Sequence, residues 1–535
     1  MKKFIICFIF SAILADPQHL ISQMSLKEKI GQLFIANICI DSTNNYKVRF
    51  PEKTTPEYVK MLMDQYNIGG IHFTGYSTIE HCKQEIEELQ KLSRYPLLVS
   101  QDFESGAAMR LLDAPKFPYN LTLGAIQDNN LIYSMGKEIA RQCKILGVHL
   151  NCAPVVDINT NSDNVIINYR SFGDDKLNVT NKALTLMHGM LDGGILCCAK
   201  HFPGHGDTEI DSHIGLPVIN YDKKRLKEIE LFPFEALINS GIPCIMTGHL
   251  QVNILDKNLP ATISYKILTE LLQNELKFRG LIITDGLNMQ ALTNFYLPGE
   301  VDLKALIAGA DLLLLSEDIP TAFRLIENAI TKNLISEEEI DRKVKKILKA
   351  KEELGILYKY KPALDENFET EEVNKLIDNL YKSAVTTFNF EGTLKEREFI
   401  YIQIGNPKET DFIRILKQNN CVFEMVDFAK SNNIINKKIV ISLFNMSKLK
   451  RDNFGISTET IEKIKLLNNQ NDIILIIFGS PYSLNLFKDI QAIIAYEEEP
   501  AAQKYAALTL LGKHHAIGKL PIKINYFETA TFAGK

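Results

Sequence analysis

Short apolar runs alternate with amphipathic stretches from about Ser25 to residue 360. Each run is almost continuously hydrophobic, which is typical of parallel strands that are buried on both faces. The runs expected to form strands are GQLFIAN, IGGIHFT, PLLVSQD, GVHLNCAPV, GILCCAKH, IPCIMTGH, GLIITDG and ADLLLLSE. Eight strands, most of them separated by helical stretches, predict an α/β fold, a (β/α)8 TIM-like barrel over residues 16–360.

A second series of apolar runs follows a polar connector, YKYKPALDENFETEEVN, near residue 360. The runs EFIYIQIG, KKIVISLFN, DIILIIFGSPYSL and AIIAYEE are again typical of buried strands, and KYAALTLLG has helical character. The pattern predicts a smaller α/β sandwich domain over residues 370–535.

Polar residues close many of the runs in the first series. In a barrel of parallel strands the active site is built at the carboxyl ends of the strands. We therefore expect this end of the barrel to carry the residues Asp102, Asn151, Lys200, His201, His249, Asp285 and Ser316.

The N-terminus has the three-part pattern of a secretory signal peptide over residues 1–15. Lys2 and Lys3 precede an apolar run over residues 4–14, and small Ala12 and Ala15 follow. The alternative is a buried first strand or helix. We expect a periplasmic or secreted protein, or a cytoplasmic one if this segment is structural. The run is too short for a stable membrane span, and no other run is long enough.

The charge balance and the cysteine spacing narrow the kinds of ligand and partner that we expect. The 535 residues include 60 basic and 65 acidic side chains, and the net charge of -5 gives no basic field for nucleic acid. The nine cysteines are scattered without a CxxC pair, so neither a disulfide framework nor a zinc site is expected.

The segment KHFPGHGDTEIDSH is the densest group of candidate catalytic side chains. His201 and His205 have the i, i+4 spacing of a zinc-binding helix. However, Pro203, Gly204 and Gly206 break a helix at this point. We therefore expect no catalytic metal, and nothing in the chain indicates a cofactor.

Three further groups each have a catalytic and a structural interpretation. In DSH, Asp211 could orient His213 and raise its pKa toward neutrality, as general acid-base catalysis requires, or the pair could lie in a solvated loop. Asp285 could attack an anomeric carbon or cap a helix. Asp102 and Arg110 could bind sugar hydroxyls or form a structural ion pair.

The motif KHFPGHGDTEIDSHIGLPVI resembles glycoside hydrolase family 3, in particular its bacterial NagZ-type β-N-acetylglucosaminidases. The segments MSLKEKIGQLF, NCAPVVDIN, NYRSFGDD, ITDGLNMQAL and AGADLLLL extend the resemblance along the predicted barrel. In the second domain, FGSPYSL, AYEEEPAAQ and GKLPI resemble the α/β sandwich of two-domain members.

The resemblance implies an activity and a role for each candidate. The activity would be retaining hydrolysis of terminal β-linked N-acetylglucosamine from peptidoglycan or chitin fragments, with Asp285 as nucleophile and His213, held by Asp211, as acid/base. The residues implied to bind the sugar are Asp102, Arg110, Arg170, Lys200 and His201. Asn151 and Asp157 would support the site.

One departure and three alternatives accompany this interpretation. Many family members read EGGR where this chain reads ESGA over residues 104–107, which affects the expected affinity and aglycone preference. A family-3 β-glucosidase or β-xylosidase would use Glu497 or Glu498 as acid/base. A phosphorylase would resolve the glycosyl-enzyme with phosphate. A non-catalytic, exported sugar-binding protein would use the same surface without chemistry.

Overall fold

The computed structural model describes residues 17–524, except 44–46, 48, 209–210, 212–213, 361–363, 365, 391–392, 395–397 and 407. The predicted signal peptide and His213 lie outside the described residues. The chain divides into two compact units. The described part of the first contains residues 17–117, Ile132–Asp157 and Ala183–Val373. The described part of the second contains Pro118–Leu131, Ile158–Lys182 and residues 374–524.

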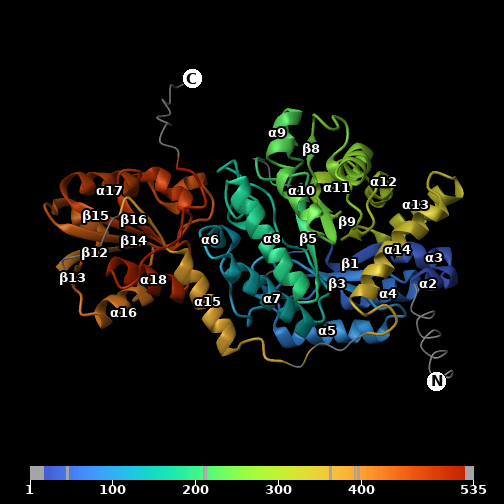
Figure 1. The fold of residues 1–535 in the computed structure, drawn as a ribbon, viewed down its shortest axis with the longest axis horizontal. Coiled ribbons are helices and arrows are strands. Elements are labelled where there is room, and N and C mark those ends of the chain that lie inside the picture. Colours follow the sequence, from blue (N-terminus) through green and yellow to red (C-terminus); the bar gives the residue numbers. More distant parts are fainter. Residues whose placement is uncertain are drawn as a thin grey trace. The chain divides into compact units, whose positions relative to one another are not determined.

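The first unit is built on an eight-stranded parallel sheet within the described part of the chain (Figure 1). Its strands are β1 Phe34–Cys39, β2 Gly70–Thr74, β3 Leu98–Gln101, β4 Leu150–Asn151, β5 Leu196–Phe202, β7 Cys244–Thr247, β9 Leu281–Thr284 and β10 Leu313–Leu314. The order is β10-β1-β2-β3-β4-β5-β7-β9, and a parallel bridge between Ile283 and Leu312 joins the two edges. The predicted barrel is confirmed, because each of the eight apolar runs overlaps one of these strands.

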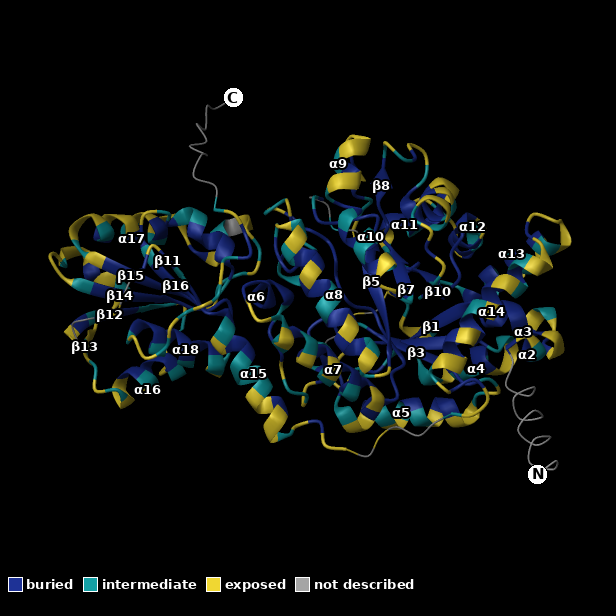
Figure 2. Ribbon diagram, in the orientation of Figure 1, coloured by how far each residue is buried: buried dark blue, intermediate teal, exposed yellow. Residues whose placement is uncertain are grey.

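Helices precede β1 and follow the strands, and they cover the outside of the barrel. They include α2 Pro17–Gln23, α3 Leu26–Gly31, α4 Pro56–Tyr66, α5 Ile79–Leu92, α7 Asn129–Leu146, α8 Lys176–Asp192, α9 Lys223–Glu228, α10 Phe232–Asn239, the π-helical η5 Lys266–Glu275, α11 Gln290–Thr293, α12 Glu300–Ala308, α13 Ile319–Thr331 and α14 Glu337–Glu353. Figure 2 shows dark, buried strands surrounded by helices with one buried and one exposed face. At the start of α3, Ser25 and Glu28 form a capping box.

A short two-stranded sheet, β6 Val218–Ile219 with β8 Gln251–Val252, lies in the loops after β5 and β7. The hydrophobic pattern did not predict it. Each strand has two residues, and Val218 is exposed, so no apolar run marks the pair.

The second unit contains a six-stranded sheet in the order β11-β16-β15-β14-β12-β13 among the described residues, with only β11 antiparallel to its neighbour. The strands are β11 Thr386–Phe388, β12 Glu398–Ile404, β13 Val422–Met425, β14 Lys438–Leu443, β15 Asp472–Ile477 and β16 Gln491–Ile494. The helices are α15 Glu371–Ala384, α16 Asp411–Gln418, α17 Thr458–Gln470 and α18 Pro500–Leu510. The predicted α/β sandwich is confirmed. The sequence missed β11, which is short, and β13, which is largely exposed.

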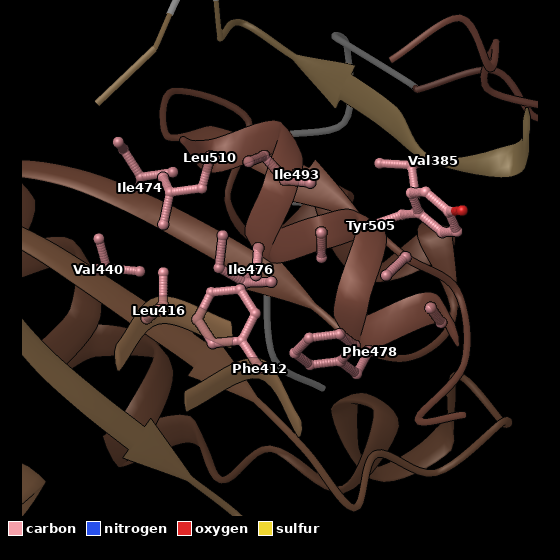
Figure 3. Close-up of a cluster of buried hydrophobic side chains, with 14 of the residues drawn as sticks. Val385, Phe412, Leu416, Val440, Ile474, Ile476, Phe478, Ile493, Tyr505 and Leu510 are labelled. Atoms are coloured by element: carbon pink, nitrogen blue, oxygen red, sulfur yellow. The ribbon is translucent and has the colours of Figure 1, made fainter. Parts of the chain in front are cut away.

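The sandwich core lies where one face of this sheet meets α16 and α18. Val440 and Ile474 are cross-strand partners, and they cluster with Phe412 and Leu416 of α16 and Leu510 of α18 (Figure 3). Full burial of such a side chain contributes about 1.5–3 kcal/mol, so this cluster supplies much of the stability of the unit.

Two segments from the predicted barrel range, Pro118–Leu131 and Ile158–Lys182, belong to the second unit. The first includes α6 Asn120–Gly124. The carboxylate of Glu497 accepts hydrogen bonds from the Tyr119 amide at 2.9 Å and the Thr122 hydroxyl at 2.7 Å. The Asn159 amide donates to the Tyr482 hydroxyl at 2.7 Å. These buried contacts tie both segments to the α/β sandwich.

Within the part of the chain that the structure describes, no helix combines the length and the apolar character needed to cross a bilayer.

Candidate active site

A charged cluster lies at the carboxyl ends of β2, β3 and β5. The ammonium of Lys200, almost fully buried, is 2.5 Å from Asp102 Oδ1 and 2.8 Å from Glu104 Oε1. His72 Nε2 and an Arg110 guanidinium nitrogen lie 3.6 and 3.7 Å from Asp102 Oδ2. The structure therefore brings together three of the predicted sugar-binding residues.

The charge balance of this cluster keeps Asp102 ionised. Burial raises the pKa of the Asp102 carboxyl, but the positive charge of Lys200, the hydrogen bond and charge of His72, and then the charge of Arg110 outweigh burial and hold the pKa well below its usual range. A carboxylate in this state only accepts hydrogen bonds, whereas Lys200 and Arg110 only donate them. The cluster can therefore bind a sugar hydroxyl as donor and acceptor at once.

Asp157 connects the end of β5 to the loop that follows. Its Oδ2 is 2.7 Å from His201 Nδ1, and its Oδ1 accepts a hydrogen bond from the His205 amide at 2.7 Å. Burial raises the pKa of the Asp157 carboxyl. The charges and hydrogen bonds of His201 and His205 lower this pKa by a larger amount, so the net shift is downward. His201 lies in β5 and His205 lies in the loop that follows, so the two do not share a helix. No set of three His, Cys, Asp or Glu residues that could hold a metal was found among the described residues.

Asp285 directly follows β9. Its amide donates to the Thr247 carbonyl at 3.0 Å, and its Oδ1 accepts a hydrogen bond from the Gly286 amide at 2.8 Å. The helix-capping alternative is wrong for Asp285, because α11 begins at Gln290 and its N-cap is Met289. Asp285 is half-buried at the carboxyl end of β9, the end of such a barrel at which active sites are built.

The charges of Asp102 and Asp285 both act on the thiol of Cys152. This thiol is buried just beyond β4. Burial raises its pKa well above the usual range, and the negative charges of Asp102 and Asp285 both add to the increase, against Lys200. Both carboxylates therefore lie within electrostatic reach of one side chain.

The remaining predicted residues are less closely defined. Asp211 is half-buried, and its carbonyl accepts hydrogen bonds from the amides of Ile214 and Gly215 at 2.9 and 3.0 Å. Because His213 lies outside the described residues, the Asp211–His213 dyad stays a prediction. Arg170 belongs to the second unit, where it donates to the Ile166 carbonyl at 3.2 Å, and its role in sugar binding also stays a prediction.

His72 and Glu104 belong to the charged cluster, although the sequence pattern did not predict them there. His72 sits inside the apolar run IGGIHFT, where a polar residue near the carboxyl end was the available signal. Glu104 was noted only as part of the departure ESGA, yet it makes a direct ion pair with Lys200. Asn151, expected to support the site, is fully buried and bonds to the Phe103 backbone through both ends of its amide.

Two bacterial proteins have sequences similar to that of this chain. The chain is 31% identical over 339 residues to β-hexosaminidase A of Pseudoalteromonas piscicida, which covers 56% of each chain. It is 26% identical over 346 residues to a β-N-acetylglucosaminidase/β-glucosidase of Cellulomonas fimi, which covers 63% of this chain and 59% of the relative. The chain thus spans less than two thirds of the length of both relatives.

A solved structure shares the whole architecture. The family 3 β-N-acetylglucosaminidase of Paenibacillus sp. strain FPU-7 is 27% identical, with a TM-score of 0.78, and the match covers 94% of this chain and 100% of that one. Residues 25–350 match the N-terminal domain of glycosyl hydrolase family 3. Because that match covers more than half of the sequence, the chain belongs to glycosyl hydrolase family 3.

Proposed function

We propose that the protein is a retaining, exo-acting β-N-acetylglucosaminidase that releases terminal β-linked N-acetylglucosamine. The observation that carries this proposal is the pairing of the Asp102–Lys200–Arg110 cluster with the Asp285 carboxylate at one end of the barrel. The names of the relatives and the DSH sequence favour the acetamido sugar over glucose.

Each residue has a defined role in the proposed double displacement. Asp285 attacks the anomeric carbon, and His213 protonates the departing glycosidic oxygen. His213 then removes a proton from water, which attacks the same carbon and releases Asp285. Asp211 fixes the imidazole. Asp102, Lys200, Arg110 and His201 bind the hydroxyl groups of the sugar.

The contacts of Glu497 and Glu498 argue against the alternative acid/base. Glu497 is buried and accepts hydrogen bonds from Tyr119, Thr122 and Tyr381, so both of its oxygens are occupied. The Glu498 carboxylate accepts a hydrogen bond from the Asn445 amide. Both carboxylates hold the second unit together, which leaves DSH as the better source of the catalytic proton.

The test is nitrophenol release from the β-N-acetylglucosaminide and the β-glucoside, with and without phosphate. The wild type should prefer the acetamido sugar without phosphate, while Asp285→Ala and His213→Ala should lose at least about 100-fold in kcat, the scale of acid-base catalysis. Preference for the glucoside together with an active His213→Ala would refute the proposal. Dependence on phosphate would instead identify a phosphorylase, and no turnover of any glycoside would identify a binding protein.

The proposed natural substrates are peptidoglycan or chitin fragments with a terminal β-N-acetylglucosamine. If residues 1–15 act as a signal peptide, the protein would meet these fragments outside the cytoplasm. N-terminal sequencing of the protein recovered from culture medium and cell fractions tests this expectation, and an intact N-terminus in the cytoplasm would refute it.

A further inference from the structure

His72 is a buried histidine of β2 whose side chain is only 2% exposed. Its register partner is Ser100 of β3, and register partners in neighbouring parallel strands place their side chains on the same face of the sheet. Asp102 follows Ser100 by two positions, just beyond the end of β3. The imidazole of His72 therefore lies beside the chain that leads into Asp102.

The two ring nitrogens of His72 face different partners. Nδ1 lies 3.0 Å from the Ser100 hydroxyl, and Nε2 lies 3.6 Å from Asp102 Oδ2. Because the ionised Asp102 carboxylate only accepts hydrogen bonds, the ring proton belongs on Nε2, which leaves Nδ1 to accept from Ser100. The Ser100 hydroxyl is 3.4 Å from the Ile71 carbonyl, so the shorter contact with the ring is the better place for its proton. Ser100 thus fixes which nitrogen of the ring donates toward Asp102.

The two oxygens of the Asp102 carboxylate have unequal surroundings. Oδ1 accepts a charged hydrogen bond of 2.5 Å from the Lys200 ammonium. Oδ2 has His72 Nε2 at 3.6 Å and an Arg110 guanidinium nitrogen at 3.7 Å. Each carboxylate oxygen has two lone pairs, so at these distances Oδ2 can still accept a proton from a sugar hydroxyl. The Asp102 side chain is 25% exposed, which leaves the carboxylate within reach of a ligand.

We propose that His72 is a positioning residue for sugar binding: its ring, oriented by Ser100, holds the Asp102 carboxylate so that Oδ2 faces the sugar. This inference rests on the proposed function, in which Asp102 binds a sugar hydroxyl. Ser100 is fully buried and His72 nearly so, and both therefore act through Asp102 rather than on the substrate. For the same reason this series of serine, histidine and aspartate offers no nucleophile.

Inhibition by free N-acetylglucosamine measures sugar binding without the chemical step. The inhibition constant Ki is measured with two reporter substrates, the phenyl and the 2,4-dinitrophenyl β-N-acetylglucosaminide. Departure of 2,4-dinitrophenolate needs little protonation, whereas departure of phenolate needs a well-placed acid. A residue that positions Asp102 should change kcat/KM for both substrates by the same factor, whereas a residue that serves the acid/base should affect the phenyl compound more.

A double-mutant cycle then shows whether His72 acts through Asp102. His72→Leu should raise Ki about 3- to 30-fold, the effect of losing one hydrogen bond. His72→Gln, whose amide can still donate toward Oδ2, should raise Ki less. In the Asp102→Asn background, His72→Leu should change Ki by less than about 2-fold, because the carboxylate that it positions is gone. Exposed His188→Leu on α8 is the control.

The outcomes separate this inference from the proposed function. If Asp102→Asn leaves Ki unchanged, Asp102 lies outside the sugar site, and the proposed binding site and this inference both fail. If Asp102→Asn raises Ki but folded His72→Leu has the wild-type Ki, or the two effects add in full, only the role of His72 is refuted. If His72→Leu unfolds, Ser100→Ala takes its place in the cycle. It keeps the ring, and it should raise Ki only while Asp102 is present; any other result refutes the role of His72.

Discussion

His249 Nε2 donates a hydrogen bond of 2.8 Å to the carbonyl oxygen of Gly286, the residue that follows Asp285. His249 is fully buried, and its Nδ1 lies 2.7 Å from the Thr262 hydroxyl, so both ring nitrogens are engaged. Gly286 in turn donates its amide proton to Asp285. The imidazole therefore orients the backbone that orients the proposed nucleophile.

Replacement of His249 by leucine should slow attack by Asp285 whatever the leaving group. We expect kcat to fall about 10- to 100-fold for both the phenyl and the 2,4-dinitrophenyl substrates, because small displacements of a reacting group are costly. His249→Gln, which can still donate a hydrogen bond, should retain more activity. His188→Leu, on the exposed side of α8, is the control. A folded His249→Leu enzyme with an unchanged kcat would contradict this role.

Asp102→Asn should weaken sugar binding while the barrel stays folded. Glu104 remains 2.8 Å from Lys200, so the buried ammonium keeps one carboxylate partner. Loss of one charged hydrogen bond to the sugar costs about 1.5–3 kcal/mol, equivalent to a 10- to 150-fold lower kcat/KM. Steady-state kinetics and inhibition by free N-acetylglucosamine measure the effect, with exposed Asp64→Asn as control. Unaltered inhibition would exclude Asp102 from the sugar site.

Glu497→Gln should affect stability and spare catalysis. The amide nitrogen of glutamine cannot accept the hydrogen bonds that Glu497 now receives from Tyr119, Thr122 or Tyr381, and each unmatched buried donor costs about 1–3 kcal/mol. The melting temperature should fall, while the ratio of rates for phenyl and dinitrophenyl substrates stays that of the wild type. Exposed Glu462→Gln on α17 is the control. A changed ratio would restore Glu497 as a candidate acid.

Asp302 on α12 should make the first unit less stable as the pH rises. Burial raises the pKa of this carboxyl from 3.8 to about 7, and the nearby Ser316 hydroxyl only partly opposes the shift. The folded chain thus keeps a proton that the unfolded chain releases near pH 4. This contribution to the free energy of unfolding is complete below pH 4 and is lost progressively up to about pH 7. It amounts to about 4 kcal/mol.

Asp302→Asn removes this titration. Its melting temperature, relative to the wild type, should therefore be higher at pH 8 than at pH 5, as measured by calorimetry with Asp64→Asn as control. A difference that does not change with pH would show that Asp302 is ionised in the folded protein.

The barrel was predictable because each of its strands is a nearly continuous apolar run, and the position of Asp285 followed from the strand that ends before it. Side-chain pairing was not predictable in the same way. The contact of Lys200 with Glu104 depends on how β3 and β5 are arranged after the barrel closes. The burial of Glu230, which directly precedes Leu231 and α10, was not predictable either, because a glutamate beside a helix is usually solvated.

The assignment of Pro118–Leu131 and Ile158–Lys182 to the second unit limits how this protein can be divided or recombined. The linear sequence alone would place a cut near residue 360, at the polar connector. It would separate Tyr119 and Thr122 from the Glu497 carboxylate and Asn159 from Tyr482. Exchange of the α/β sandwich between relatives must therefore transfer three pieces of chain together. A gene fusion at the polar connector alone would take Pro118–Leu131 and Ile158–Lys182 from one relative and the rest of the α/β sandwich from another, so the buried contacts between them would no longer match.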